Sequence, residues 1–198
     1  MYGQPLRQSF YQQPTLEVAK SLLGKVLVKE TSEGIAAGTI VETEAYLGPE
    51  DRAAHSYGNR RTKRTEVMFG PAGHVYTYEM HTHCLVNVVC GALDMPHAVL
   101  IRAVEPCVGE DLMRKRRGDN KKRTALTSGP GKLTRALGIT KADYGHRLDQ
   151  PPLYITEGGI QINDEQMMVG PRIGIDGAKE ARAYPWRFWV EGNPFVSR

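Results

Sequence analysis

The sequence predicts an α+β fold: a single domain over residues 1–198, with a mixed, largely antiparallel β-sheet core and flanking helices. The length of 198 residues is that of one domain, which can bury a core without disulfide bridges. Hydrophobic residues make up 40% of the chain and charged residues 24%, as in globular proteins, so a disordered chain is excluded. The expected strands come in runs and do not alternate strictly with helices, which favours an antiparallel sheet.

The first expected elements are a helix and two strands. Within 15–23 the apolar residues recur at helical spacing, and Gly24 can end that helix. Residues 25–30 and 38–46 are typical of strands, joined by a turn near 32–34.

A long irregular loop is expected over 47–73, because this segment is rich in glycine, proline and charge. A loop of that length in a compact domain is usually functional. The elements expected after it are, in chain order, a strand or hairpin arm at 74–89, a strand at 98–106, a short basic helix at 109–118, a loop leading into a helix at 129–138, and strands at 152–156, 172–176 and 187–192.

Several protein classes are excluded by composition and patterning. No apolar run approaches the roughly 18 residues of a membrane-spanning helix, and the N-terminus lacks the charged and apolar regions of a secretory signal. The three cysteines, Cys84, Cys90 and Cys107, are an odd number without a C-x-x-C motif, which argues against a disulfide framework. We therefore expect a cytoplasmic protein that does not act at a membrane.

Basic residues are concentrated in two short segments. The net charge is +4 and the isoelectric point about 9.0, but 11 of the 26 basic residues lie in 60–64 and 114–123. Such clusters suit contacts with nucleic-acid phosphates. Solvated loops or a charged helix face would explain them equally well.

The strand with the sequence VETEAY, 41–46, holds two carboxylates. Because side chains alternate along a strand, Glu42, Glu44 and Tyr46 lie on one face and the residues between them on the other. If this face lines a cleft, one glutamate can act as a general base toward water. The alternative is an exposed sheet face whose acids meet solvent.

Histidines and tyrosines supply further candidates. His55 follows a Gly-Pro turn and is expected near the end of the Glu44 strand, where it could serve acid–base chemistry or simply donate a hydrogen bond. His81 and His83 could share a strand face and bind a metal, but no second ligand cluster accompanies them, so no metal is expected. Tyr76 and Tyr78 suit either base stacking or core packing.

The SGPGKL segment, 128–133, places two glycines and Lys132 at the start of a helix. Backbone amides there, together with the lysine, can hold a phosphate. The spacing is not that of a nucleotide-binding P-loop, and an ordinary turn into a helix would also explain it.

Seven segments in chain order carry a resemblance to a known family. They are LLGKVLV at 22–28, IVETEAYLGPEDRAAHS at 40–56, MFGPAGHVYTY at 68–78, LIRAVEP at 100–106, SGPGKL at 128–133, PRIGI at 171–175 and the closing WRFWVEGNPFVSR. They extend over nearly the whole chain, and the second is long and specific. The sequence resembles the bacterial members of the alkyladenine (3-methyladenine) DNA glycosylase family of base-excision repair.

The resemblance implies a monomeric enzyme without metal or other cofactor, acting on damaged double-stranded DNA of the bacterial nucleoid. Such an enzyme flips a damaged purine out of the duplex and hydrolyses its N-glycosidic bond by water attack at C1′. The implied substrates are 3-methyladenine, 7-methylguanine, hypoxanthine and ethenoadenine. No lysine lies in the 41–46 strand, so a monofunctional glycosylase without a Schiff-base intermediate is expected.

The matching motifs also imply roles for single residues. Glu44 corresponds to the carboxylate that activates the attacking water, and Arg102 to a residue that helps hold this water, together with a main-chain carbonyl in 171–175. The walls of the implied base pocket are Tyr46, His55, Tyr78 and Asn87, of which the asparagine would disfavour guanine by crowding its exocyclic amine. The DNA backbone would be bound by Arg60, Arg61, Lys63, Arg64, Arg116, Arg117 and Lys132.

The hairpin departs from the family pattern. The family has Y-x-Y-x-x-Y-G-M before its Cys, Leu and Asn, whereas this chain has YTYEMHTHCLVN, one residue shorter. A protruding, DNA-intercalating hairpin is still implied, with His81 or Met80 in place of the family's intercalating tyrosine. Two other functions stay open: a non-enzymatic nucleic-acid-binding protein that uses the basic segments, and a metal-dependent hydrolase built on His55, His81 and His83.

Overall fold

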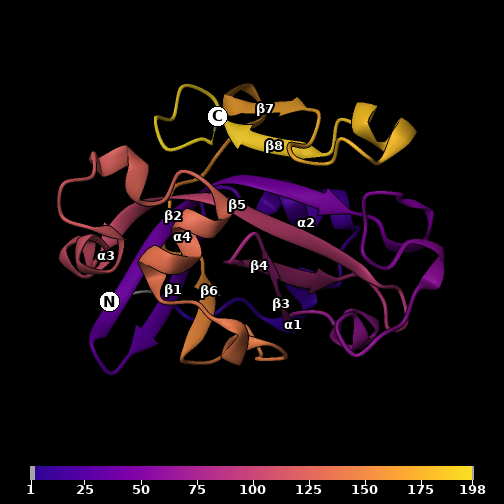
Figure 1. The fold of residues 1–198 in the computed structure, drawn as a ribbon, viewed down its shortest axis with the longest axis horizontal. Coiled ribbons are helices and arrows are strands. Elements are labelled where there is room, and N and C mark those ends of the chain that lie inside the picture. Colours follow the sequence, from indigo (N-terminus) through magenta and orange to yellow (C-terminus); the bar gives the residue numbers. More distant parts are fainter. Residues whose placement is uncertain (1–2, 198) are drawn as a thin grey trace.

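An eight-stranded antiparallel sheet forms the centre of the computed structural model, which describes residues 3–197. Its strands are β1 (Val26–Thr31), β2 (Gly34–Tyr46), β3 (Val75–Met80), β4 (His83–Cys90), β5 (His97–Val108), β6 (Leu153–Thr156), β7 (Met167–Gly170) and β8 (Arg187–Val190). The order is β3-β4-β5-β2-β1-β6, and β8 joins β2 and β7 (Figure 1). The predicted domain over 1–198 also includes residues 1, 2 and 198, which lie outside the described residues.

Short helices flank this sheet. The α-helices are α1 (Gln8–Tyr11), α2 (Thr15–Ser21), α3 (Glu110–Arg117) and α4 (Pro130–Leu137). The 3-10 helices are η1 (Gly48–Glu50), η2 (Tyr57–Asn59), η3 (Glu66–Phe69), η4 (Arg123–Leu126), η5 (Lys141–Asp143), η6 (Asp164–Gln166) and η7 (Lys179–Ala183). Within residues 3–197, none of these helices has the length and apolarity needed to cross a membrane.

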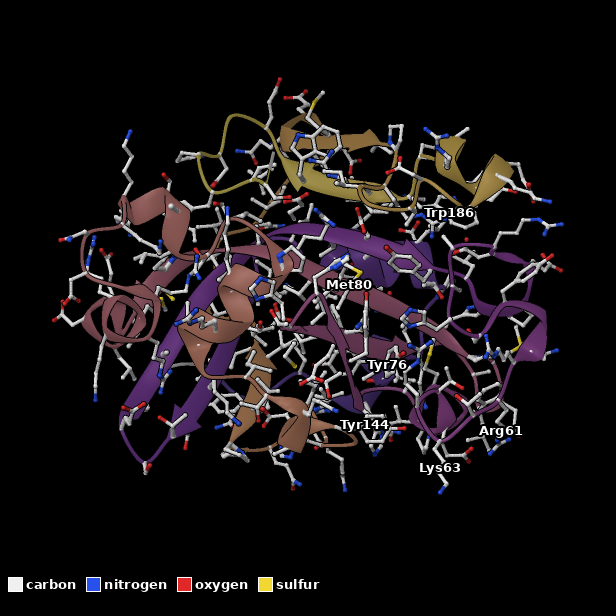
Figure 2. All side chains as sticks on the ribbon, in the orientation of Figure 1. Arg61, Lys63, Tyr76, Met80, Tyr144 and Trp186 are labelled. Carbon is white, nitrogen blue, oxygen red and sulfur yellow. The ribbon has the colours of Figure 1, made fainter. Side chains whose placement is uncertain are left out.

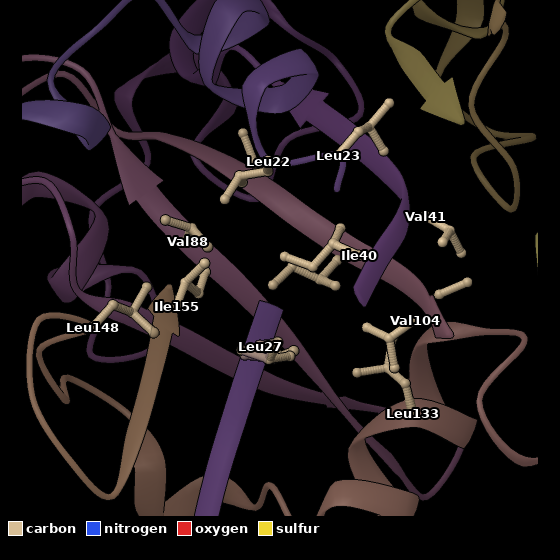
Figure 3. Close-up of a cluster of buried hydrophobic side chains, with 14 of the residues drawn as sticks. Leu22, Leu23, Leu27, Ile40, Val41, Val88, Val104, Leu133, Leu148 and Ile155 are labelled. Carbon is tan, nitrogen blue, oxygen red and sulfur yellow. The ribbon is translucent and has the colours of Figure 1, made fainter. Parts of the chain in front are cut away.

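The hydrophobic core lies between the sheet and its helices. Leu22, which follows α2, and Leu133 of α4 are fully buried in one cluster with Leu27, Ile40 and Val104 of the sheet (Figure 3). In Figure 1, α4 crosses in front of the strands. Helices of this length are marginal alone, so burial of their apolar faces stabilises them.

The long strand β2 positions the candidate carboxylates. Its first half pairs with β1, and residues 42–44 pair with β8 on one side, while β5 runs along the other. The alternation is as predicted: Val41 and Ala45 join the core, and the Thr43 hydroxyl donates a hydrogen bond to the Ala19 carbonyl of α2. Glu42 and Glu44 therefore face away from α2, and on that side Ile173, Arg187 and Ser197 contact them.

The predicted α+β class with an antiparallel sheet is confirmed, and several boundaries are corrected. The second strand starts at 34, not 38, and the 74–89 segment is two strands joined by His81 and Thr82. Because His81 lies in this turn with φ 48°, the predicted strand face shared with His83 is wrong. The 47–73 segment contains η1, η2 and η3, and neither α1 nor β7 was predicted.

The strand predicted at 172–176 is wrong. This segment has no regular structure, because its polar groups bind other parts of the chain. Arg172 is hydrogen-bonded to Asp51, and the Ile173 amide donates to Glu44. The alternating pattern of Ile173 and Ile175 does not reveal such partners.

Candidate active site

Both carboxylates of β2 are completely buried, so the alternative of a solvent-exposed acidic face is wrong. Glu44 accepts hydrogen bonds from the Tyr46 hydroxyl at 2.8 Å and from the Ile173 amide at 2.7 Å. Its Oε1 also lies 3.2 Å from Nη1 of Arg102, in an ion pair. A buried carboxylate needs such donors, since an uncompensated charge in the interior is very costly.

Glu42 serves as the anchor of the neighbouring cations. Its carboxylate accepts from Nε of Arg102 at 2.9 Å and from Nε of Arg187 at 2.8 Å. The amide and hydroxyl of Ser197 donate to it at 2.7 and 2.9 Å. Arg102 therefore bridges the two glutamates, and the C-terminal segment completes the network.

Arg102 remains a cation in this setting. Burial disfavours its charge, but the charges of Glu44 and Glu42 outweigh burial and raise the Arg102 pKa above its ordinary value. Arg102, predicted to help hold the attacking water, is thus in direct contact with Glu44, and its role toward the water stays a prediction. In the 171–175 segment, the group that reaches Glu44 is an amide, and a carbonyl contact to water stays a prediction.

A cavity of about 120 Å³ lies directly above this network. All four residues predicted for the base pocket line it: Tyr46, His55, Tyr78 and Asn87. Arg102 and Ile173 line it as well, so Glu44 lies one layer below, in contact with three lining residues. The structure therefore brings the predicted acid–base group and the predicted pocket together.

Aromatic rings form one wall of this cavity. Tyr76 and Tyr78 are stacked with centroids 5.6 Å apart, and the His55 ring meets Tyr78 edge-on at 4.5 Å. Nδ1 of His55 is hydrogen-bonded to the Tyr76 hydroxyl at 2.7 Å. Burial, and then the nearby charges of Arg64 and Arg60, lower the His55 pKa to about 4. His55 is therefore a neutral imidazole at pH 7.

Asn87 lines the same cavity, and a hydrogen bond holds its side chain in place. Its side chain is 3% exposed, and Nδ2 donates to the Tyr76 carbonyl at 3.1 Å across the β3–β4 pair. This bond directs the amide of Asn87, whose side chain also lines the cavity.

The hairpin of β3 and β4 ends at the cavity. Met80, 42% exposed, lines the cavity and is labelled near the centre of Figure 2. The next residues, His81 and Thr82, both have positive φ, at 48° and 69°, as a tight two-residue hairpin turn requires. Gly131 of α4 packs against His83, since a Cβ at Gly131 would lie 2.6 Å from that side chain. The 128–133 turn thus supports the hairpin, with Lys132 exposed beside it.

The basic segment 60–64 lies on the surface near the cavity. Arg60, Lys63 and Arg64 are exposed, and no ion pair joins them to any residue between 3 and 197. Arg61 instead pairs with Glu66 at 2.6 Å. Lys63 and Arg64 line an open cleft of about 530 Å³ that shares Tyr78 with the cavity, and Figure 2 shows Lys63 on the same side as Tyr144.

The second basic segment is partly used inside the fold. Arg116 donates to the Leu137 carbonyl at 2.7 Å, at the end of α4, and pairs with Glu33. Arg117 donates to the Leu126 carbonyl at 3.1 Å. These two arginines satisfy carbonyls near helix ends, so reversing their charge would disturb the fold as well as any contact with phosphates.

The candidate metal ligands are not brought together. His55 lines the cavity, whereas His81 lies in the hairpin turn and His83 packs on α4. Within the part of the chain that the structure describes, no three His, Cys, Asp or Glu side chains are arranged to hold a metal ion.

Sequence reasoning missed Asp51, Arg172, Arg187 and Ser197 as parts of this site. Each belongs to a segment that carries the family resemblance, and this was the only feature of the sequence that could have indicated their part in the site. Arg187 and Ser197 contact Glu42, and Asp51 pairs with Arg172, only through contacts between segments far apart in the chain.

Comparison with known proteins agrees with this geometry. The model of the methylpurine-DNA glycosylase family matches residues 9–194. A relative from Bacillus licheniformis, named as a 3-methyladenine DNA glycosylase, is 63% identical over 195 residues, which are 98% of this chain and 97% of the relative. Relatives with the same name from Bacillus velezensis and Bacillus subtilis are each 60% identical, over 99% and 98% of this chain and 98% and 97% of their own lengths.

Proposed function

The chain belongs to the methylpurine-DNA glycosylase family, and on that basis we propose that Glu44 activates a water molecule to release damaged purines from DNA. Enzymes of this family are DNA glycosylases, which hydrolyse the N-glycosyl bonds of damaged bases in DNA repair. The family expected from the sequence motifs is therefore confirmed, and membership favours an enzyme over a DNA-binding protein without catalysis.

The observation that carries the proposal is the buried Glu44 carboxylate beneath the cavity. A carboxylate has about four acceptor positions, and hydrogen bonds from Tyr46 and Ile173 use two of them. In the proposed reaction, Glu44 takes a proton from water, the water oxygen bonds to C1′, and the glycosidic electron pair leaves with the base. The carboxylate charge also stabilises the oxocarbenium-like sugar.

Arg102 and the cavity walls have supporting roles in this proposal. Arg102, held by both glutamates, helps to orient the water beside Glu44. Tyr46, His55 and Tyr78 contact the flipped purine by stacking or at its edge, and Asn87 crowds the exocyclic amine of guanine. Among the described residues no lysine lines the cavity, which supports a monofunctional, water-dependent reaction without a Schiff base.

The surface around the cavity would hold the duplex. A flipped base leaves a gap in the stack, and in this proposal the hairpin tip with Met80 and His81 enters it. Arg60, Lys63 and Arg64 would contact phosphates without reading sequence, together with Arg61 and Lys132. Arg116 and Arg117 would contact phosphates with the part of each guanidinium that does not donate to the Leu137 and Leu126 carbonyls.

A lesion panel tests the function and defines the substrate range. Duplexes carrying one 3-methyladenine, 7-methylguanine, hypoxanthine or ethenoadenine are compared with undamaged adenine under single-turnover conditions. We expect release of at least one damaged purine and no detectable release of adenine. Release of none of the four by folded, DNA-binding protein would contradict the proposal.

A further inference from the structure

A buried ion pair lies beside the cavity at a place that the proposed chemistry does not use. The side chains of Arg172 and Asp51 have no exposed surface. Two hydrogen bonds, of 2.6 and 2.8 Å, join the two Nη atoms of the guanidinium to the two carboxylate oxygens. The pair connects residues 121 positions apart in the chain, and Nη1 also donates to the Ala45 carbonyl of β2 at 2.8 Å.

Asp51 fixes one wall of the cavity. Its carboxylate accepts from the Leu47 amide at 3.2 Å and from the Ala53 amide at 3.0 Å, which closes the turn after β2. Ala53 and His55, which this turn places, both line the cavity.

Arg172 fixes another wall and reaches Glu44 by two routes. It directly precedes Ile173, which lines the cavity and whose backbone amide donates a hydrogen bond to Glu44. Its guanidinium also lies over the Tyr46 ring, 4.6 Å from the centroid, and the Tyr46 hydroxyl is the second donor to Glu44. It also lies 5.0 Å from the centroid of the Trp186 ring, which Figure 2 places beside the C-terminal strands.

We propose that Asp51 and Arg172 are positioning residues for base excision, which hold the Glu44 carboxylate and two cavity walls in register. This inference rests on the proposed function of Glu44. Neither residue lines the cavity, so both act through the Ile173 amide, the Tyr46 ring and the turn at 51–55. Misplacing a reacting group by about 1 Å can cost about 10²-fold in rate.

A purely structural role predicts a different result, and neutral substitution separates the two. Removing one partner of a buried ion pair leaves an unpaired charge and destabilises the fold strongly, whereas replacing both partners is often tolerated. The double variant Asp51→Asn/Arg172→Gln removes both charges together. Lys29 and Asp143 form a second buried ion pair, away from the cavity lining, and Lys29→Gln/Asp143→Asn is the matched control.

The experiment measures single-turnover excision at saturating protein, duplex binding and thermal unfolding for both double variants. We expect Asp51→Asn/Arg172→Gln to fold and bind duplex but to excise about 10²-fold more slowly. The control should keep the wild-type rate even where its melting temperature falls equally. A wild-type rate in folded Asp51→Asn/Arg172→Gln would overturn the inference.

Arg172→Lys keeps the test decisive if the double variant does not fold. Lysine retains the charge opposite Asp51 but loses the planar fork and the ring stacking. A folded Arg172→Lys protein should lose excision rate and keep duplex binding, and an unchanged rate would again overturn the inference. If Glu44→Gln excises normally, the proposed function itself fails; if only the Asp51 and Arg172 variants excise normally, the positioning role alone fails.

Discussion

Replacing Glu44 with Gln removes the carboxylate charge while keeping its shape and its hydrogen bonds. Oε1 faces the fixed amide of Ile173 and the Arg102 guanidinium, so the carbonyl oxygen of glutamine takes that position. The amide nitrogen then faces the Tyr46 hydroxyl, which can rotate to accept a hydrogen bond. The substitution therefore separates the chemistry of Glu44 from its geometry.

The expected loss of rate follows from the role of a general base. Such a group typically contributes about 10²–10⁴-fold, so single-turnover excision by Glu44→Gln should fall by that factor, equal to about 3–5 kcal/mol in the barrier. The fold should suffer less, because Arg102 keeps its ion pair with Glu42. We expect the free energy of unfolding to fall by about 1–3 kcal/mol, the cost of weakening a buried polar contact.

Glu42→Gln is the matched comparison, and the structure predicts that it loses more stability and less excision rate than Glu44→Gln. One oxygen of Glu42 accepts from Arg102 and Arg187, and the other from the Ser197 backbone amide. These nitrogens cannot become acceptors, so the amide of glutamine meets a donor in either orientation. We expect unfolding to become easier by about 3–5 kcal/mol, as when a buried pair is broken, with a smaller direct effect on excision.

The assay is single-turnover release of hypoxanthine or 3-methyladenine from a duplex, with binding and thermal unfolding measured on the same preparations. Glu44→Gln should bind the damaged duplex, melt about 2–12 °C below the wild type and release almost no base. Near-normal excision by Glu44→Gln, with excision abolished in Glu42→Gln, would refute the assignment of the catalytic carboxylate.

Further predictions concern charge, pH and the hairpin. The unfolded chain binds a proton at His55 near pH 6.5, whereas the folded protein does so only near pH 4. The free energy of unfolding should therefore fall as the pH is lowered from 6.5 to 4, and it should fall less in His55→Gln. If denaturant titrations show the same loss of unfolding free energy in the wild type and in His55→Gln, this prediction is contradicted. Charge reversal at Lys63 and Arg64 should weaken binding to damaged and undamaged duplexes alike and reduce its salt dependence; a loss confined to one lesion would point to the cavity instead. His81→Ala should lower the fraction of flipped base reported by ethenoadenine fluorescence, with a smaller effect on excision from single-stranded substrate. If His81→Ala flips the base normally but Met80→Ala does not, Met80 is the residue that enters the gap in the base stack.

The local pattern of the sequence determined the strand face on which we propose that the chemistry takes place. Alternation of side chains is a property of the extended backbone, so the common face of Glu42, Glu44 and Tyr46 could be predicted before any tertiary contact was known. The family motifs predicted the four pocket residues, and the structure gathers these around one cavity. Both predictions depend on short-range geometry or on matched sequence segments.

Tertiary structure decided which polar side chains hold that face in place. Burial of Glu42 and Glu44 depends on β8 and on Ser197, 155 residues from Glu42. Arg172 lies in a segment whose sequence predicts a strand, yet its pairing with Asp51 accompanies an irregular backbone. Hydrogen bonds between such distant segments leave no periodic signal in the sequence.

The basic segments show the same division. As sequence, 60–64 and 114–123 are similar runs of positive charge. In the folded chain, Arg64 is exposed beside the cavity, whereas Arg116 satisfies carbonyls at the end of α4. Composition determines how many cations the chain carries, but only the packing of helices against one another determines which cations are left to meet a phosphate.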